Sequence, residues 1–273
     1  MQTLVLNPQQ HPLQQLSIIS AIKKGYRNFL KLREANRISS HFSEYFLPIL
    51  ALDDTLRHEV FNIRHRVYCE ELHFEPMQDD ALEHDEFDAY STHCLLKHLS
   101  IGAFAGTVRI VRPKSDAELL PIEKFCSDSI THETLHPKFF PREQICELSR
   151  LAVPLDYRRR KSDQFSGAAT GAINQEVYSE TELRCFPFIA VGLYLAAAST
   201  VLNHNITHTY VMMEPRLARS MSFIGIKFEK IGPTIDYHGQ RAPYYINPHL
   251  FFSHLSPGFK SMFNNIIKQL EKP

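Results

Sequence analysis

The sequence lacks the features that mark several large classes of protein. Its 273 residues carry 30 basic and 30 acidic side chains, so the formal net charge is zero, whereas domains that bind nucleic acid are generally basic. We therefore expect no nucleic-acid partner. The five cysteines are scattered and form no C-x-x-C pair, which argues against a disulfide framework and against a zinc site. We expect no bound metal and a reducing, cytoplasmic environment.

Long hydrophobic runs are also scarce. Residues 1–12 are polar, so a secretory signal is not expected. One uncharged run, FPFIAVGLYLAAASTVL, covers residues 186–202 and contains Pro187 and Gly192. A membrane span needs about 20 apolar residues, so this shorter and interrupted run favours a buried core helix.

A basic amphipathic helix is predicted over residues 14–37. Its apolar residues Ile18, Ile22, Tyr26 and Phe29 recur at helical spacing, and lysines and arginines lie largely on the other side. Such a helix either packs on the domain with its charges in solvent, or contacts a membrane surface or an acidic carrier protein. Both interpretations stay open, including peripheral contact with the inner face of a membrane.

The remaining chain alternates between helical and extended patterns. Helices are predicted at about 53–72, at 186–202 and from Pro215, and strands at 91–98, 103–112, 145–153, 206–214 and, as paired strands, within 227–246. This order predicts an α/β domain of the α+β type with a mixed sheet flanked by helices. We expect an N-terminal helical extension at 1–50, the main domain at 51–255 and a C-terminal helix at 256–273.

Charged residues gather in stretches that are far apart in the sequence. The predicted helix contains FNIRHRVYCEEL (61–72), and the acidic loop contains LEHDEFDAYSTH (82–93). Surface ion pairs and a solvated loop are the ordinary explanations for both stretches. In the strand FAGTVRIVR, Arg109 faces the side opposite Val108 and Ile110, because side chains alternate along a strand.

The stretch CELSRLAVPLDYRRR (146–160) is the most informative of these. It places Glu147 and Arg150 in an otherwise apolar strand, where a charge is costly unless it is paired or lines a cavity. Strict alternation puts Glu147 on one face with Ser149, and Arg150 on the other. Cys146 faces away from Glu147 and has no evident histidine partner, so an acyl-cysteine intermediate is not favoured.

Taken in order, the motifs RHRVYCEEL, EHDEFDAYSTHCLL, GTVRIVRP and CELSRLAV followed by RRR resemble the acyl-homoserine-lactone synthases. They are still more similar to the acyltransferases associated with PEP-CTERM/exosortase systems and to the N-acyl amino acid synthases. The later run MMEPRLARSMSFIGIKFEKIGPTIDYHGQRAPYYI is similar to the exosortase-associated group in particular. The resemblance covers about residues 55–250. It implies a GNAT-like fold, with a strongly bent mixed sheet that is splayed where the donor's pantetheine arm enters.

The resemblance also implies a set of site residues. Six charged positions match those that form an interlocked network beside the family's acceptor pocket: Arg66, Asp85, Asp88, Arg109, Glu147 and Arg150. Three carboxylates and three guanidiniums can neutralise one another in a partly buried cleft. For Arg66, Asp88 and Arg150, a purely structural role that fixes the N-terminal lobe to the sheet is the alternative.

Within this set we expect Glu147, Arg109 and Arg150 to act in catalysis, and Arg66, Asp85 and Asp88 to bind substrate. Glu147 is the expected base for the acceptor ammonium, because a carboxylate in a cleft has a raised pKa. Backbone N–H groups are expected to bind the thioester carbonyl, and they belong to Leu151, Ala152 and Val153.

The segment after this strand bears on the donor. Acetyl-CoA enzymes of the wider superfamily carry a Q/R-x-x-G-x-G/A loop there, whose N–H groups hold a pyrophosphate. Here the segment is DYRRRKSDQFSG, without a glycine before Gly167. No bound cofactor is expected, and the co-substrate is acyl-CoA or, as the better fit, an acyl-(acyl carrier protein). A basic docking site for this acidic partner, or else a solvated basic turn, is formed by Arg158, Arg159, Arg160 and Lys161.

The expected acceptor is an amino acid or another small amine. The resemblance implies S-adenosylmethionine for the lactone synthases and an amino acid such as tyrosine for the amino acid synthases. The lactone synthases usually carry a tryptophan in the N-terminal loop, whereas this chain has no tryptophan and has Phe74 nearby. A lactone synthase is therefore an alternative, as are a non-catalytic acyl- or lipid-binding module and a membrane-surface protein anchored by residues 14–37.

Overall fold

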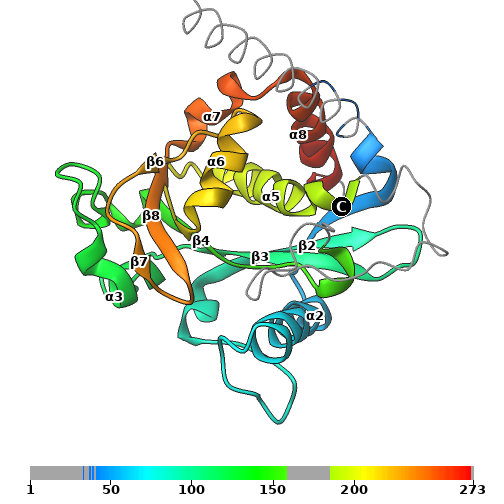
Figure 1. The fold of residues 1–273 in the computed structure, drawn as a ribbon, viewed down its shortest axis with the longest axis horizontal. Helices are drawn as coiled ribbons and strands as arrows, with labels where there is room; N and C mark the ends of the chain where they lie inside the picture. The colour runs from blue at the N-terminus through cyan, green and yellow to red at the C-terminus, as the bar shows by residue number, and fades with distance from the viewer. Residues whose placement is uncertain (1–32, 34–36, 38, 40, 159–184, 272–273) are drawn as a thin grey trace, which may run out of the picture.

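The computed structural model describes residues 33, 37, 39, 41–158 and 185–271. Its centre is an eight-stranded sheet in the order β1-β2-β3-β4-β5-β8-β6, with β7 paired to β8 (Figure 1). Every pair of neighbouring strands is antiparallel except β4 and β5, which are parallel. This confirms the predicted mixed sheet. The strands are β1 (Phe46–Leu50), β2 (Ser91–His98), β3 (Phe104–Val111), β4 (Ile145–Ala152), β5 (His208–Met213), β6 (Glu229–Lys230), β7 (Ile235–Asp236) and β8 (Gln240–Ile246).

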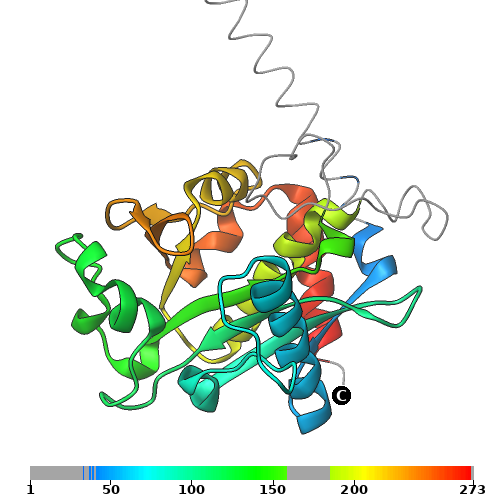
Figure 2. The same ribbon diagram turned by 60° about the horizontal axis from the view of Figure 1, so that its bottom comes forward.

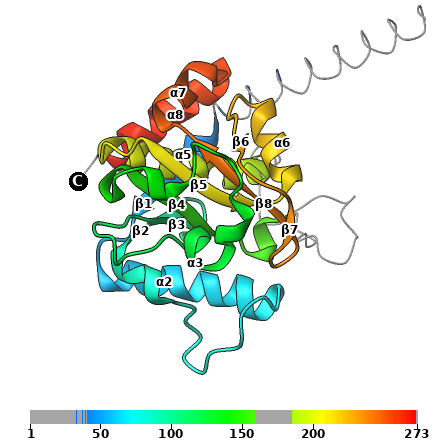
Figure 3. The same ribbon diagram turned by 90° about the vertical axis from the view of Figure 1, so that its left-hand side faces the viewer.

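Helices cover the two faces of this sheet. On one face α5 (Ile189–Asn203) packs against β2 and β3 and is covered in turn by α8 (Pro257–Leu270), and α2 (Asp54–His65) lies on the opposite face (Figures 2 and 3). Val108 and Ile110 point into the α5 side of the core, and Arg109 points to the α2 side, as alternation predicts. The shorter helices are α3 (Pro121–Cys126), α6 (Pro215–Phe223) and α7 (Pro248–His254).

The apolar run predicted as a core helix is α5. Because α5 lies between the sheet and α8, it is buried all round, and Leu193 and Ala197 have no exposed surface. Within the described ranges, no helix combines the length and the apolar character needed to cross a membrane.

The helix predicted over 53–72 is present, but it changes from an α-helix to a π-helix after His65. Asp53 caps α2, because its Oδ1 accepts a 2.8 Å hydrogen bond from the backbone N–H of Leu56. After His65 the chain continues as a π-helix, Arg66–Glu71. π-helical turns are rare and occur frequently at functional sites.

The boundaries expected at residues 50 and 256 do not separate independent parts. β1 is a strand of the central sheet, and Phe42 and Phe46 are fully buried in the same core cluster as α5. The C-terminal helix is present as α8, but Phe259 and Ile266 are also fully buried in that cluster. The amphipathic helix predicted at 14–37 lies, apart from isolated positions, outside the described residues.

Candidate active site

The two parallel strands at the centre of the sheet are paired over only part of their length. Their register runs from Ile145 opposite His208 to Leu148 opposite Val211. β4 continues to Ala152 and β5 continues to Met213, and β5 also pairs with β8 on its other edge. Beyond Leu148 the strands share no backbone pairing, so the sheet is open between them, as the resemblance implied.

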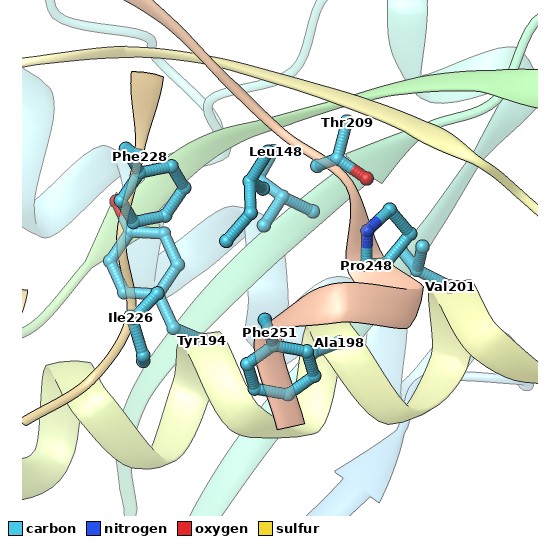
Figure 4. A pocket seen from close by; sticks show the side chains of 10 residues that line it. Leu148, Tyr194, Ala198, Val201, Thr209, Ile226, Phe228, Pro248 and Phe251 are labelled. Atoms are coloured by element: carbon cyan, nitrogen blue, oxygen red, sulfur yellow. The ribbon is translucent and has the colours of Figure 1, made fainter. Parts of the chain in front are cut away.

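An apolar cavity of about 30 Å³ lies beside this opening, on the face of the sheet that α5 covers (Figure 4). Leu148 of β4 forms one wall, and Tyr194 and Val201 of α5 form another. The remaining walls come from β5, from the segment after α6 and from α7, through Thr209, Ile226, Phe228, Ile246, Pro248 and Phe251.

A network of buried ion pairs lies on the other face of the sheet. Arg64 of α2 has no exposed side-chain surface, and it donates hydrogen bonds to Glu83 (2.5 Å) and Asp88 (2.7 Å). Arg109 of β3 donates to Asp85 (2.5 Å) and to Asp88 (3.0 Å). Asp88 therefore joins α2 to the central strands.

The acidic loop is shaped so that its carboxylates reach the arginines. Asp85 caps the short 3-10 helix Glu86–Tyr90 by accepting from the N–H of Phe87 (3.0 Å). Asp88 in turn accepts from the N–H of Asp85 through Oδ2 (2.7 Å), which leaves its Oδ1 for Arg64 and Arg109. This capping box fixes both carboxylates before any arginine binds them.

Arg150 joins the same network because β4 contains a bulge. Between the pairs Thr107–Ala152 and Arg109–Ser149 the register shifts by one residue, and Arg150 has a left-handed backbone with φ of 47°. Its guanidinium reaches Glu75 (2.9 Å), Glu83 (3.1 Å) and Asp85 (3.2 Å). The expectation from strict alternation, that Arg150 faces away from Glu147 and Ser149, was therefore wrong.

The assignment of Arg66 to the network was also wrong. Arg66 is 42% exposed and pairs with Asp156 (2.7 Å) and Glu71 (3.3 Å), outside the network. The buried arginine is Arg64, which is four residues from Val60 and shares its helix face. This spacing was the signal that identifies Arg64. Glu75 and Glu83 were missed as well, because a charge in a loop carries no such periodicity.

The charges of the network set the protonation states of its members. Burial tends to raise the pKa of Asp88, but Arg64 and Arg109 outweigh it and hold that pKa well below its usual value. The pKa of Glu83 is lowered in the same way by Arg64 and Arg150. Both acids are therefore ionised. Burial lowers the pKa of the neighbouring His93 to about 4, so this imidazole is neutral at physiological pH.

Glu147 lies on the same face but is held differently. It is 2% exposed, and its Oε2 accepts a 2.7 Å hydrogen bond from the backbone N–H of Ile122 in α3. No ion pair reaches it from a described residue, although Arg109 and Arg150 lie close enough to act on its charge. Burial raises its pKa to about 8 against these influences. A carboxyl with this pKa can exchange a proton near neutral pH.

The other predicted site residues lie around the opening. Leu151 accepts a 2.8 Å hydrogen bond from the Tyr68 hydroxyl through its carbonyl, Ala152 pairs with β3, and Val153 is buried. Whether their N–H groups bind a thioester carbonyl stays a prediction. Cys146 faces the α5 side, and burial raises its pKa to about 12, so it is not a nucleophilic thiolate.

The basic segment after β4 is described only at its start. Arg158 is 12% exposed and pairs with Glu71, so it is not a free docking charge. Arg159, Arg160 and Lys161 lie outside the described residues. In the part of the chain that the structure covers, no group of three or more histidine, cysteine or acidic side chains is arranged to hold a metal ion.

Residues 63–167 match the family model of the acetyltransferase (GNAT) domain. The matched segment covers less than half of the chain, and the mixed sheet that opens between two parallel strands agrees with a GNAT-like fold. A comparison with curated proteins found no significant match.

Among solved structures, the chain is similar to the acyl-homoserine-lactone synthase LasI, with 17% identity, a TM-score of 0.53 and coverage of 75% of this chain and 90% of LasI. It is similar to BjaI, a CoA-dependent acyl-homoserine-lactone synthase solved with SAM and isopentyl-CoA, at 13% identity and a TM-score of 0.53, covering 83% and 91%. FeeM, an N-acyl amino acid synthase from uncultured soil microbes, is similar at 12% identity and a TM-score of 0.50, covering 77% and 94%. At these identities the likeness concerns the fold.

Proposed function

We propose that the protein is an N-acyltransferase, which moves a fatty acyl group from an acyl carrier protein or acyl-CoA thioester to the amine of an amino acid or another small molecule. The position of Glu147 carries this proposal. Its carboxyl is buried one residue before the strands part, on the face of the charged network. The apolar cavity begins at Leu148 on the opposite face. A proton acceptor and an apolar site thus meet across one opening.

The cavity supports a fatty rather than an acetyl group as the cargo. Its walls are apolar, and it lies where a thioester that passes between β4 and β5 would direct its acyl chain. At about 30 Å³ it holds little more than one water molecule as it stands. An acyl chain therefore requires the cavity to widen. We propose that Phe228, in the segment before β6, and Phe251 of α7 move to allow this, since both lie outside the central strands.

In the proposed reaction Glu147 accepts a proton from the acceptor ammonium. The free amine then attacks the thioester carbon, the N–C bond forms, and the carbonyl electrons pass to an oxyanion. Backbone N–H groups of residues 151–153 are the proposed donors to this oxyanion. When it collapses, the C–S bond breaks and the thiolate takes up the proton that Glu147 holds. The nitrogen loses its remaining extra proton to the regenerated carboxylate of Glu147, which releases it to solvent, and the neutral amide is left. With a pKa of about 8, Glu147 suits both proton transfers.

The ionised network has a positioning role in this scheme. Arg109 is bonded to Ser149 (3.1 Å) as well as to the acidic loop, and Arg150 is fixed by three carboxylates. Their side chains thus hold β4 against the loop and keep positive charge near Glu147, which limits the rise of its pKa. The proposed docking of a carrier protein on Arg159, Arg160 and Lys161 stays a prediction from the sequence.

A lactone synthase that uses S-adenosylmethionine is the second candidate. The similarity to LasI and BjaI favours it, and BjaI is a CoA-dependent enzyme, so a CoA thioester stays a candidate donor. A link to PEP-CTERM/exosortase systems, a cytoplasmic location and peripheral membrane contact remain predictions.

The test is to incubate the purified chain with acyl carrier protein thioesters and acyl-CoA of several lengths. Each donor is combined with a pool of amino acids or with S-adenosylmethionine, and products are detected by mass spectrometry. We expect an N-acyl amino acid, lost in Glu147→Gln and retained in Glu143→Gln, an exposed position on the approach to the same strand. An acyl-homoserine lactone as the product would favour the second candidate. Absence of any N-acyl product with every donor would refute the proposal.

A further inference from the structure

Arg241, at the start of β8, differs from the arginines of the network. Arg64, Arg109 and Arg150 each bind at least two carboxylates. Among the described residues, the side chain of Arg241 has no ion pair and no hydrogen-bonded partner. It lies over an aromatic ring, with 5.8 Å from its Cζ to the centre of Phe74. Arg241 is half-buried. A guanidinium in this position is available for an anion from outside the chain.

The strand register places Arg241 on the face of the sheet that carries Glu147. Glu147 is aligned with Tyr210 of β5, and Tyr210 is aligned with Tyr245 of β8. Side chains alternate along β8, so positions 241, 243 and 245 point to one face. Arg241 thus approaches the opening from the β5–β8 side, whereas Arg150 approaches it from β4.

The β7–β8 hairpin bridges this opening. Its turn carries His238, whose ring lies 5.2 Å from that of Phe74, and Tyr237, whose ring stacks on Phe125 of α3 at 6.5 Å. Phe74 follows the π-helix beside β4, so the hairpin reaches from its own side of the sheet to the other side of the gap. Figures 1 and 3 show the hairpin extending toward the side of the sheet where α2 lies.

Arg241 and Glu147 both act electrostatically on the same two side chains, which supports the placement given by the strand register. The hydroxyl of Tyr237 and the thiol of Cys126 each experience both the positive charge of Arg241 and the negative charge of Glu147. The hydroxyls of Tyr68 and Tyr194 also lie within the field of Arg241, and Tyr194 lines the apolar cavity. The charge of Arg241 therefore reaches residues on both faces of the sheet near the opening.

We infer that Arg241 binds the carboxylate of an α-amino acid acceptor and thereby directs its amine toward Glu147. A guanidinium binds a carboxylate through two parallel hydrogen bonds, which fixes orientation as well as charge. Arg150 is unsuited to this role, because Glu75, Glu83 and Asp85 already neutralise it. The inference rests on the proposed function and narrows its acceptor to amines that carry a carboxylate.

The experiment compares amino acids with the amines obtained by removing their carboxylate: L-tyrosine with tyramine, L-phenylalanine with phenethylamine, and L-leucine with isoamylamine. For the wild-type chain we expect a higher kcat/KM with the amino acid of each pair. Arg241→Gln should raise the KM for the amino acid roughly 10- to 100-fold, as expected for a charge-assisted pair. The KM values for the matching amine and for the acyl donor should stay unchanged. Arg241→Lys should bind the amino acid more tightly than Arg241→Gln but less tightly than the wild type. Lysine keeps the positive charge but cannot form two parallel hydrogen bonds to a carboxylate.

Arg219→Gln is the matched control, since Arg219 is an exposed arginine on α6. An equal rise in KM for tyramine and tyrosine in Arg241→Gln would assign Arg241 a structural role and overturn the inference. A rise confined to the KM of the donor would overturn it too, by assigning Arg241 to the thioester. If the wild-type chain acylates only S-adenosylmethionine or nothing at all, the proposed function itself fails, and that result is distinct from the other two.

Discussion

Arg64 of α2 donates a 2.7 Å hydrogen bond to Asp88 of the acidic loop, 24 residues further along the chain, and the arginine has no exposed side-chain surface. Burying such a charge is unfavourable unless its partners stay in place. The pair therefore links the position of α2 to that of the strands behind Asp88. The first predictions concern this dependence.

Removing the side chain of Arg64 should lower the free energy of unfolding far more than removing the side chain of Arg66. In Arg64→Met, Glu83 loses its shortest contact and Asp88 keeps Arg109 as its one arginine partner. Breaking a buried pair in this way costs about 3–5 kcal/mol. Arg66 is 42% exposed, so the loss in Arg66→Met should be less than about 1 kcal/mol. Urea unfolding of both variants measures the difference. Equal losses would show that the buried network does not stabilise the fold.

The stabilising effect of Asp88 should disappear in acid. Its pKa is lowered in the folded state, so the folded protein binds a proton less readily than the unfolded chain. The contribution is therefore complete above the unfolded value of about 3.8 and declines as the pH falls below it. We expect the difference in unfolding free energy between wild type and Asp88→Asn to be large at pH 6 and to shrink as the pH falls toward 3. A constant difference across this range would contradict the assignment.

The bulge at Arg150 gives a prediction about backbone strain. Arg150 has φ of 47°, a conformation that costs a residue with a Cβ about 1–2 kcal/mol relative to glycine. Arg150→Ala and Arg150→Gly both lose the guanidinium, but only glycine relieves the backbone. Arg150→Gly should therefore be about 1 kcal/mol more stable than Arg150→Ala, and both should have lost most activity. Thermal unfolding and the acyltransferase assay together check this ordering.

Local patterns in the sequence predicted the elements but not the irregularities that build the site. Val60, Ile63 and Val67 identify the buried face of α2, and the charge-free run identifies α5, because burial imposes its own periodicity. The bulge that turns Arg150 toward the network inserts one residue into β4, and no alternation pattern reveals it. Motif resemblance pointed to Arg66, whereas the helical spacing from Val60 points to Arg64.

Contacts between distant segments could not be predicted in the same way. Arg241 and Phe74 meet because the β7–β8 hairpin crosses the opening, and nothing near either residue in the sequence indicates this. The pKa of Glu147 likewise depends on tertiary structure, because burial raises it and the N–H of Ile122 in α3, 25 residues away, counters part of that rise. The chemistry of the site therefore depends on tertiary structure even where its residue types are evident from the sequence.

Ionisation of Glu147 should lower the stability of the fold and raise the rate of the reaction in the same pH range. Its pKa rises from 4.5 to about 8 on folding, so between these values the folded state retains a proton that the unfolded chain has released. Stability linked to this group is therefore greatest below pH 4.5 and declines as the pH rises to 8. Glu147→Gln removes the titration, and its amide oxygen can still accept from the N–H of Ile122. At pH 9 this variant should be at least about 1 kcal/mol more stable than the wild type, which corresponds to about 2–4 °C in Tm.

The rate of acyl transfer should rise with pH where the stability falls, because a general base acts only when it is ionised. For the wild type, kcat should rise about tenfold per pH unit below pH 7 and level off above a pKa of about 8. Glu143→Gln should keep this profile, since that side chain is exposed. Glu147→Gln should lose it together with most of the rate, while gaining Tm at high pH. A variant that is inactive but no more stable at pH 9 would indicate that Glu147 is ionised in the resting protein. The rise in rate toward pH 8 would then have to come from the titration of a different group.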